Sequence, residues 1–287
     1  MEISIRKNHE LRLKAFDLMN ELKNKNVPRK EIIDKIHEKF GINIMTLYDW
    51  YKGKFRPYGR KGESVFKSEL FYVLGALLGD GCIYNWKTTN HYIILVGDSG
   101  FTAKYADRIT ECIGTKTKHY INRSNNTWFV RSNNFKLYSL FKKVREDLIY
   151  LEYLIKDNEK QSSISFIEGF FDAEGCVKII KEKVRKTPKI CLDITNTNFE
   201  VLDLIRRLLK EHLGIEAKYS IQKADGVKNK QIAYHLRIYK KEFVRKFFEN
   251  INTTKLKEEK VSYVENWLKL NENASKHSGS SSQPVTN

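Results

Sequence analysis

The chain has 287 residues, of which 41% are apolar and 12% are aromatic. This length and composition can bury one large core or two smaller ones, which excludes a disordered polymer. The net charge of +17 favours a polyanionic partner, above all nucleic acid. Charge alone also fits a basic protein whose lysines are merely solvated, so both interpretations stay open at this point.

The four cysteines are spaced without a CxxC pair and without histidines at zinc-ligand spacing. This pattern argues against a zinc module or a disulfide scaffold. We expect reduced cysteines in the core at positions Cys82, Cys112, Cys176 and Cys191. The sequence has no apolar run of transmembrane length and no signal-peptide layout at its start, so we expect a soluble, intracellular protein with no membrane partner, located in the cytoplasm or with the host genome.

The first 51 residues carry three helical patterns. Apolar residues at helical spacing predict a helix over residues 9–25, and a second is expected over residues 29–40 after Pro28. Gly41 then breaks the pattern, and Asn43 can cap a third helix over residues 44–51. This order is typical of a helix-turn-helix module.

In such a module the last helix enters the major groove of DNA. The expected groove-facing residues of the third helix and its C-terminal end are Thr46, Tyr48, Asp49 and Lys52. Residues 52–61 are rich in glycine and positive charge, which fits a linker with an arm that lies in a minor groove, including Arg56 and Arg60. A small accessory bundle without DNA contact is the alternative interpretation.

From residue 66 onward the chain consists of two similar halves. A helix-like phrase occurs at residues 73–81 and again at residues 167–175, and each copy opens the same series of elements. The series is helix, two strands, helix, two strands, helix. We therefore expect an α+β fold of two pseudo-symmetric αββαββα halves, each with an antiparallel sheet covered by helices on one face, after the small all-α N-terminal domain.

The expected strands of the first half open at residues 81–84 and return at 91–96, followed by 116–123 and 128–131, with a closing helix at 135–143. Those of the second half are 175–178, 189–194, 216–223 and 233–239, with a closing helix at 241–250. The helix inside each half starts at a cap near residue 98 or 196 and ends at Gly114 or Gly214. Residues 271–287 are serine-rich and are expected to be a disordered tail.

Each copy of the phrase ends in a carboxylate, Asp80 or Glu174, followed by glycine. Small residues four apart precede both acids, which would let two helices approach closely. An acid at a helix C-terminus is disfavoured by the macrodipole, and a divalent cation would compensate it. Either copy alone fits an ordinary turn, but the repetition after 94 residues favours a shared metal site.

At these two motifs the chain resembles the LAGLIDADG homing endonucleases, in their single-chain form with two motifs, over residues 66–270. The resemblance implies a saddle of two sheets in the DNA major groove, with both motif helices forming the central seam. It implies that Asp80 and Glu174 bind metal with the backbone carbonyls of Gly79 and Ala173, and that the ion is Mg²⁺. It also implies cleavage of both strands, leaving 5′ phosphates and short 3′ overhangs.

Related enzymes place a cation or a glutamine near the reacting phosphate. Candidates for such a catalytic role are Lys178, four residues after Glu174, and Arg131 and Arg237, on equivalent strands of the two halves. Tyr84 stands where the second half has Lys178, and Gly97 and Asn196 lie near the glutamine position. A solvated or phosphate-positioning role fits each cation equally well.

Alternate strand positions and hairpin tips should contact DNA. In the first half these are Tyr84, Trp86, Lys87, Thr88, Asn90, Lys116, Lys118, Tyr120, Asn122 and Arg123. In the second half they are Lys178, Lys181, Lys183, Arg185, Lys189, Lys218, Ser220, Gln222, Lys223, Lys228 and Lys230. A solvated outer sheet face is the alternative.

The sequence thus predicts a monomeric, Mg²⁺-dependent, site-specific DNA endonuclease. The expected domains are 1–62 (helix-turn-helix and basic linker), 63–160 (first half), 161–270 (second half) and 271–287 (tail). Other functions of the same scaffold stay open, namely an RNA maturase that binds its intron RNA and a DNA-binding regulator that does not cut. A basic nucleoid protein would instead show no sequence preference.

Overall fold

The structure of the protein is a computed structural model that describes residues 2–54, 57, 68–86, 90–158, 160–180, 189–224 and 231–269. Contacts between Cα atoms divide the chain into two compact units. The first comprises residues 1–73 and 80–150, and the second comprises residues 74–79 and 151–287. None of the helices in these described parts is both long and apolar enough to cross a membrane.

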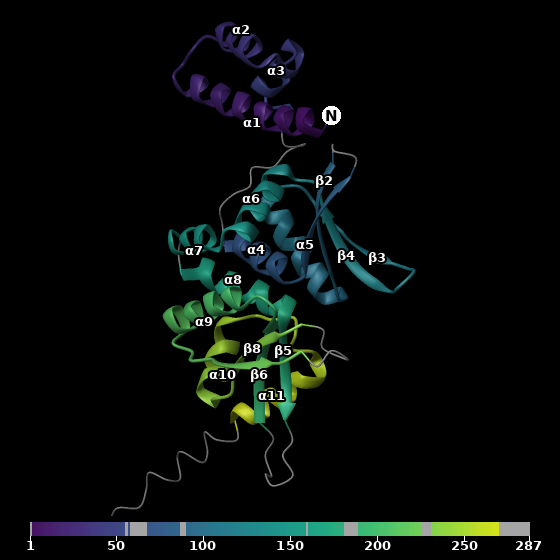
Figure 1. Cartoon of the computed structure of the whole chain (residues 1–287), viewed down its shortest axis with the longest axis vertical. Helices are drawn as coiled ribbons and strands as arrows, with labels where there is room; N and C mark the ends of the chain where they lie inside the picture. Colours follow the sequence, from purple (N-terminus) through teal and green to yellow (C-terminus); the bar gives the residue numbers. More distant parts are fainter. Residues whose placement is uncertain are drawn as a thin grey trace, which may run out of the picture. The chain divides into compact units, whose positions relative to one another are not determined.

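Three helices lie at the N-terminus: α1 (Glu2–Asn24), α2 (Arg29–Phe40) and α3 (Ile44–Tyr51) (Figure 1). The left-handed backbone of Gly41 (φ 64°) ends α2, and the Asn43 side chain accepts a hydrogen bond from the Met45 amide at the start of α3. Apolar residues of all three helices share one core, in which Phe16 and Trp50 meet edge to face. The second and third helices have the predicted bounds, whereas α1 starts seven residues before the predicted residue 9.

The first unit continues with half of α4 (Ser68–Asp80), and then β1 (Gly81–Trp86), β2 (Asn90–Gly97), α5 (Ser99–Ile113), β3 (His119–Asn122), β4 (Thr127–Ser132) and α6 (Phe135–Glu146). The four strands form an antiparallel sheet in the order β1-β2-β4-β3. Helices α5 and α6 pack against this sheet (Figure 1). Asp98 caps the start of α5, and Gly114 ends it with φ 61°, as the sequence predicts.

The second unit repeats this plan. After α7 (Leu148–Lys156) come α8 (Lys160–Glu174), β5 (Gly175–Ile180), β6 (Lys189–Asn196), α9 (Phe199–Leu213), β7 (Lys218–Gln222), β8 (Ala233–Ile238), α10 (Lys241–Asn250) and α11 (Glu258–Lys269). The sheet order is β5-β6-β8-β7, and α9 and α10 pack against this sheet. The expected α+β fold of two αββαββα halves is therefore confirmed, with α7 and α11 as additions that the sequence did not predict.

Each sheet buries one face and leaves the other open. In the first sheet, Ile93, Leu95 and Val130 point to the helices and are at most 2% exposed. In the second, Leu192, Ile194 and Leu236 are fully buried in the same way. Because side chains alternate along a strand, the intervening residues line the open face of each sheet.

Two expectations about the cysteines differ in outcome. All four cysteines are free thiols, but only Cys112 and Cys191 are buried. Cys82 and Cys176 are exposed, so their prediction as core residues was wrong. Each is the second residue of the strand that follows a motif helix, and the strand alternation turns it to the open face of its sheet.

Candidate functional site

The glycines of the first motif lie against the second motif helix. Residues 74–79 of α4 belong to the second unit, as does α8. A Cβ atom on Gly75 would overlap the Phe166 carbonyl oxygen and lie 2.9 Å from the Phe170 amide nitrogen. A Cβ on Gly79 would overlap the Ala173 side chain and lie 2.9 Å from Cγ of Glu174. Only glycine permits this approach of two helix backbones, as the spacing of the small residues predicts.

The two motif acids end their helices. Asp80 is the last residue of α4 and is exposed, and Glu174 is the last residue of α8 and is half-buried. The Asn196 side-chain amide at the end of β6 donates a hydrogen bond of 2.8 Å to Oε1 of Glu174. This bond fixes the direction of the Glu174 carboxylate, and Asn196 is thus in contact with a candidate metal ligand.

The other acids of the second motif have a different role. Asp172 is fully buried and accepts hydrogen bonds from the Thr253 hydroxyl (2.6 Å) and the Thr254 amide (2.7 Å). Glu168 is 8% exposed and accepts from the Asn252 amide at 3.3 Å. Both carboxylates therefore bind the segment after α10 to α8, which leaves Glu174 as the acid of α8 that reaches solvent.

The residues at the helix ends fit a hard divalent cation. Carboxylates and the carbonyl oxygens of a last helical turn, which lack intrahelical donors, are the ligand types that Mg²⁺ prefers. Among the described residues, no group of three or more His, Cys, Asp and Glu side chains is arranged to hold a metal ion. A cation at Asp80 or Glu174 would consequently need oxygen ligands from the backbone and from a bound phosphate as well.

A buried carboxylate organises the open face of the second sheet. Asp193 of β6 is 1% exposed and accepts a hydrogen bond from the Lys178 ammonium group. Its oxygens also lie 3.1 Å from Nδ1 of His235 and 3.4 Å from Nε of Arg237. Nε2 of His235 lies 3.1 Å from the Gln222 side-chain oxygen, which extends the network to β7.

This network sets the ionisation of two groups. Burial alone would raise the pKa of Asp193, but the hydrogen bonds from Lys178 and His235 outweigh it, so the pKa lies below its usual value. For the neighbouring Cys191 thiol, burial and the charge of Asp193 together raise the pKa to about 11. Asp193 is therefore an anion, and Cys191 a neutral thiol, at neutral pH.

The three cations expected to assist catalysis have different surroundings. Lys178 of β5 and Arg237 of β8 both contact Asp193. Arg131 of β4 takes the position of Arg237 in the first sheet, but it lies 4.9 Å from the ring centre of Tyr92 and pairs across the strands with Ile94, the counterpart of Asp193. The two halves are thus asymmetric at these positions, with Tyr84 in place of Lys178.

Asp193 and His235 were missed by the sequence analysis. Asp193 interrupts an apolar strand, which is the signal that could have drawn attention to it. His235 lies 42 residues further along the chain. No local pattern connects these two residues, because they meet only through the pairing of β6 with β8.

The predicted DNA-contacting residues of the sheets fall into four groups. On the open faces lie Tyr84, Tyr120, Asn122, Lys178, Lys189, Lys218, Ser220 and Gln222. Exposed just outside the strands lie Lys116, Lys118, Arg123 and Lys223. Trp86 and Asn90 end β1 and begin β2, and outside the described residues lie Lys87, Thr88, Lys181, Lys183, Arg185, Lys228 and Lys230.

The predicted groove-facing residues at the third N-terminal helix differ in exposure, and Asp49 is half-buried. Lys52 is exposed, whereas Thr46 and Tyr48 are half-buried and the Arg29 guanidinium lies 5.5 Å from the Tyr48 ring. Met45 is 69% exposed and was not predicted to contact DNA. Arg56 and Arg60 of the expected arm lie outside the described residues, as does the tail of residues 271–287.

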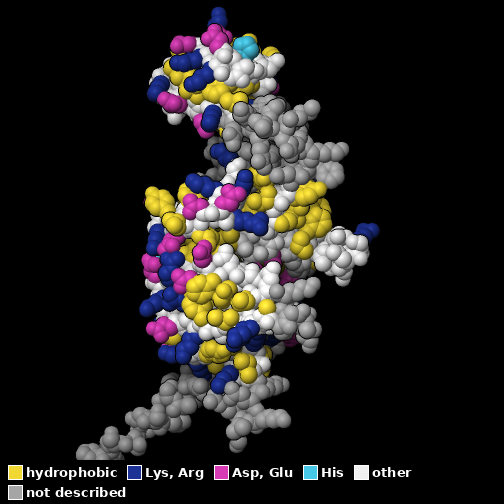
Figure 2. All heavy atoms as spheres, viewed as in Figure 1, with side chains coloured by type: hydrophobic (Ala, Val, Ile, Leu, Met, Phe, Trp, Pro, Cys, Tyr) yellow, Lys and Arg dark blue, Asp and Glu magenta, His cyan; other side chains and the backbone are white. Residues whose placement is uncertain are grey.

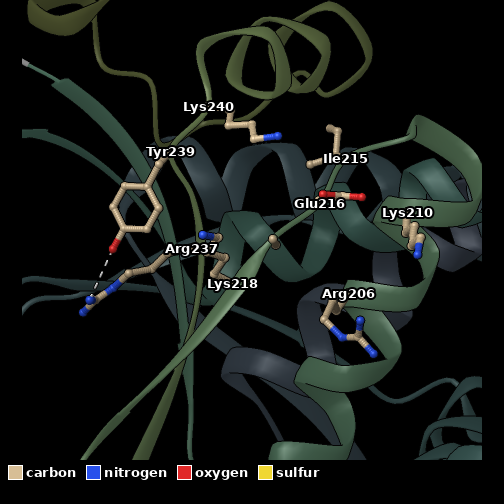
Figure 3. Close-up of a pocket in the computed structure, with 9 residues that line it drawn as sticks. Arg206, Lys210, Ile215, Glu216, Lys218, Arg237, Tyr239 and Lys240 are labelled. Atoms are coloured by element: carbon tan, nitrogen blue, oxygen red, sulfur yellow. Dashed lines mark hydrogen bonds between the residues drawn. The ribbon is translucent and has the colours of Figure 1, made fainter.

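A basic pocket lies at the edge of the second sheet. It has a volume of about 250 Å³ and is formed by the end of α9, the start of β7 and the end of β8 (Figure 3). Five of the nine described lining residues are lysine or arginine, and one, Glu216, is acidic. The lining residues are Arg206, Lys210, Ile215, Glu216, Ala217, Lys218, Arg237, Tyr239 and Lys240. Arg237 belongs both to this pocket and to the Asp193 network, so the positive charge continues from the open face to the edge.

Comparison with known proteins agrees with this architecture. The family model described as a LAGLIDADG-like domain matches residues 162–252, which run from α8 to just past α10. Over these residues the chain is similar to a LAGLIDADG-like domain. This domain corresponds to the second half, and the first half repeats its order of elements and its strand pairing.

Two proteins of Methanocaldococcus jannaschii, both described as uncharacterized, are similar in sequence. One is 28% identical over 92% of this chain and 96% of its own length, and the other is 34% identical over 56% of this chain and 60% of its own length. Among solved structures, that of I-DmoI in complex with DNA and Ca is similar at 20% identity, with a TM-score of 0.48, over 68% of this chain and 96% of that chain.

Proposed function

We propose that this protein is a site-specific DNA endonuclease of the homing type, which cuts both strands of a long duplex in a reaction that depends on a divalent cation. The observation that carries the proposal is the contact of Gly79 with Ala173 and Glu174. Asp80 follows Gly79 directly, so the Cα atom of Asp80 is about 3.8 Å from the Cα atom of the glycine that makes this contact. Two acids at the ends of two contacting helices supply what a cation between two scissile phosphates requires.

In this proposal Asp80 and Glu174, with the carbonyls of Gly79 and Ala173, hold Mg²⁺. When bound, the cation would lower the pKa of a water molecule and neutralise charge on the phosphate. Asn196 keeps the Glu174 carboxylate directed by its hydrogen bond of 2.8 Å. Arg131 of the first half provides positive charge near the reacting phosphates. Lys178 and Arg237, both held by Asp193, add positive charge on the open face of the second sheet. The products would carry 5′ phosphates and short 3′ overhangs.

The rest of the chain supplies DNA affinity. The open faces of both sheets contact the major groove, and the basic pocket accepts a backbone phosphate. The N-terminal helices, as a helix-turn-helix domain, add contacts through a tether and so raise the effective concentration of the sheets at the target. The protein acts as a monomer, because one chain carries both motifs.

The test compares Asp80→Asn and Glu174→Gln with the unchanged protein on a duplex selected by the full chain from a randomised library in the presence of chelator. Both variants should bind this duplex with unchanged affinity but lose double-strand cleavage in Mg²⁺. Glu146→Gln is the matched control, since Glu146 is the exposed last residue of α6 and has no part in the proposed site.

Cleavage of both strands at the unchanged rate by either variant would refute the assignment, and so would activity that chelator does not remove. Selection of no duplex at all would refute DNA as the substrate. Incubation with precursor RNA of the host intron tests the maturase alternative, and tight DNA binding without any cutting would instead identify a regulator.

A further inference from the structure

The described middle of the open face of the first sheet is apolar, with Asn122 at one end. Tyr84, Val96 and Tyr120 on this face are 45%, 43% and 49% exposed. Phe129 pairs across the strands with both Val96 and Tyr120, so three strands contribute to one continuous apolar surface. Ile94 and Tyr92 extend it along β2. Figure 2 shows hydrophobic side chains gathered over β2 and β4.

Cations surround this surface. Lys118 and Arg123 are exposed on either side of β3, and Arg131 lies over the Tyr92 ring. A centre of apolar side chains with a positively charged rim complements the major groove, whose rims are phosphates and whose floor carries the thymine methyl groups. A second copy of the chain fits less well, because its own cations would face the same rim.

The open face of the second sheet has the opposite character at the equivalent positions. Asp193 replaces Ile94, His235 replaces Phe129, and Lys178 replaces Tyr84. The buried Asp193 carboxylate keeps Lys178 and Arg237 directed along this face. Arginine and lysine donate hydrogen bonds to O6 and N7 of guanine, which are acceptors on the major-groove edge.

From this difference we propose that the two sheets read halves of different base composition, and this inference rests on the proposed function. The first sheet reads an A·T-rich half through contacts of Val96, Phe129 and Tyr120 with thymine methyl groups. The second reads a half that contains guanine through Lys178 and Arg237. The target is therefore asymmetric in chemistry although the protein is pseudo-symmetric in fold.

Replacement of thymine by deoxyuridine removes the methyl group and leaves base pairing intact. The full chain first selects duplexes from a randomised library in the presence of chelator, and the composition of the two halves is read from the selected sequences. Thymines of one half at a time are then replaced by deoxyuridine, and Kd is measured. Each contacted methyl should weaken binding about fourfold, from the transfer free energy of one methylene-sized group, and only in the A·T-rich half.

Protein variants connect this effect with the first sheet. For Val96→Ala, deoxyuridine at one of the thymines should no longer weaken DNA binding, whereas it weakens binding of the unchanged protein about fourfold. A double-mutant cycle measures this coupling between Val96 and the thymine methyl group. Tyr120→Phe should keep the full effect, because the ring remains. Ile149→Ala is the matched control, since Ile149 of α7 is apolar, 83% exposed and outside both sheets.

Equal sensitivity of both halves to deoxyuridine, or sensitivity of neither, would overturn the inference while leaving the endonuclease assignment intact. The same holds if the selected halves do not differ in composition. A change of oligomeric state in Val96→Ala would also overturn it, since the apolar face would then be an interface between copies. Failure to select any duplex would refute the proposed function itself.

Discussion

Replacement of Gly75 by alanine tests the contact between the motif helices. The new Cβ would overlap the Phe166 carbonyl oxygen and lie 2.9 Å from the Phe170 amide nitrogen. Ordinary contacts of this kind are about 3.5 Å long, so the two helices would have to separate by roughly 1 Å. Both neighbours are backbone atoms of one helix and cannot rotate away as a side-chain tip could.

The expected size follows from two opposing effects. Overpacking of a buried contact costs about 3 kcal/mol or more, and alanine in place of glycine in a helix returns about 1 kcal/mol. Gly75→Ala should therefore lower the free energy of unfolding by about 2 kcal/mol or more. The double-strand cleavage rate should fall as well, because the helix ends that carry the two acids move with the helices.

Urea unfolding of the full chain, followed by circular dichroism, measures the stability change. Gly100→Ala is the matched control, since Gly100 is also helical but its nearest neighbour would be 3.6 Å from the new Cβ. This control should be neutral or slightly stabilising. If Gly75→Ala proved as stable as the unchanged protein, the close approach of α4 and α8 could not be the reason for glycine at this position.

Two further changes test the second sheet. Asp193→Asn should lower the free energy of unfolding by about 2 kcal/mol at pH 7. The pKa of Asp193 is lower in the folded protein than in the unfolded chain. The ionised carboxylate therefore stabilises the fold above about pH 4, and this stabilisation is lost as the pH falls through the folded pKa. In urea titrations at several pH values, the stability difference between Asp193→Asn and the unchanged protein should thus vanish in acid. A stability difference that does not depend on pH would contradict this account. Asp157→Asn is the control, since Asp157 is exposed. Replacement of Lys210 and Lys218, which line the basic pocket, by alanine should reduce the slope of log Kd against log salt by about 2. Replacement of Lys142 and Lys156 by alanine removes the same charge outside the pocket and should leave the slope unchanged.

Local sequence signals determine much of the fold. Asn43 and Asp98 accept the predicted capping hydrogen bonds, and Gly41, Gly114 and Gly214 adopt the left-handed backbone that ends a helix. These signals act within a few residues, so one sequence is enough to read them. The repetition of the motif then supplied the order of the strands in both halves, because one half served as a template for the other.

The sequence revealed less of the site, since its contacts join distant residues. In the sequence, Asp193 is a single acidic residue in an apolar strand, and its partners His235 and Arg237 become adjacent only when β8 pairs with β6. Helix α7 is apolar on most of its surface and follows α6 after a single residue, so the pattern did not separate the two. The exposed Cys82 and Cys176 were misplaced because cysteine is more often buried. The alternation that places Tyr84 and Lys178 on the open face also places these cysteines there, but it was not applied to them.

The hydrogen bonds of Asp172 affect how the second half can be isolated as a fragment. The match to the LAGLIDADG-like domain stops at residue 252, yet Thr253 and Thr254 are the donors to this buried carboxylate. A fragment trimmed to the match would leave the buried Asp172 side chain without these two donors. Expression boundaries for this half should therefore be placed beyond residue 254, and a fragment designed from the family match alone would lose stability for a reason unrelated to catalysis.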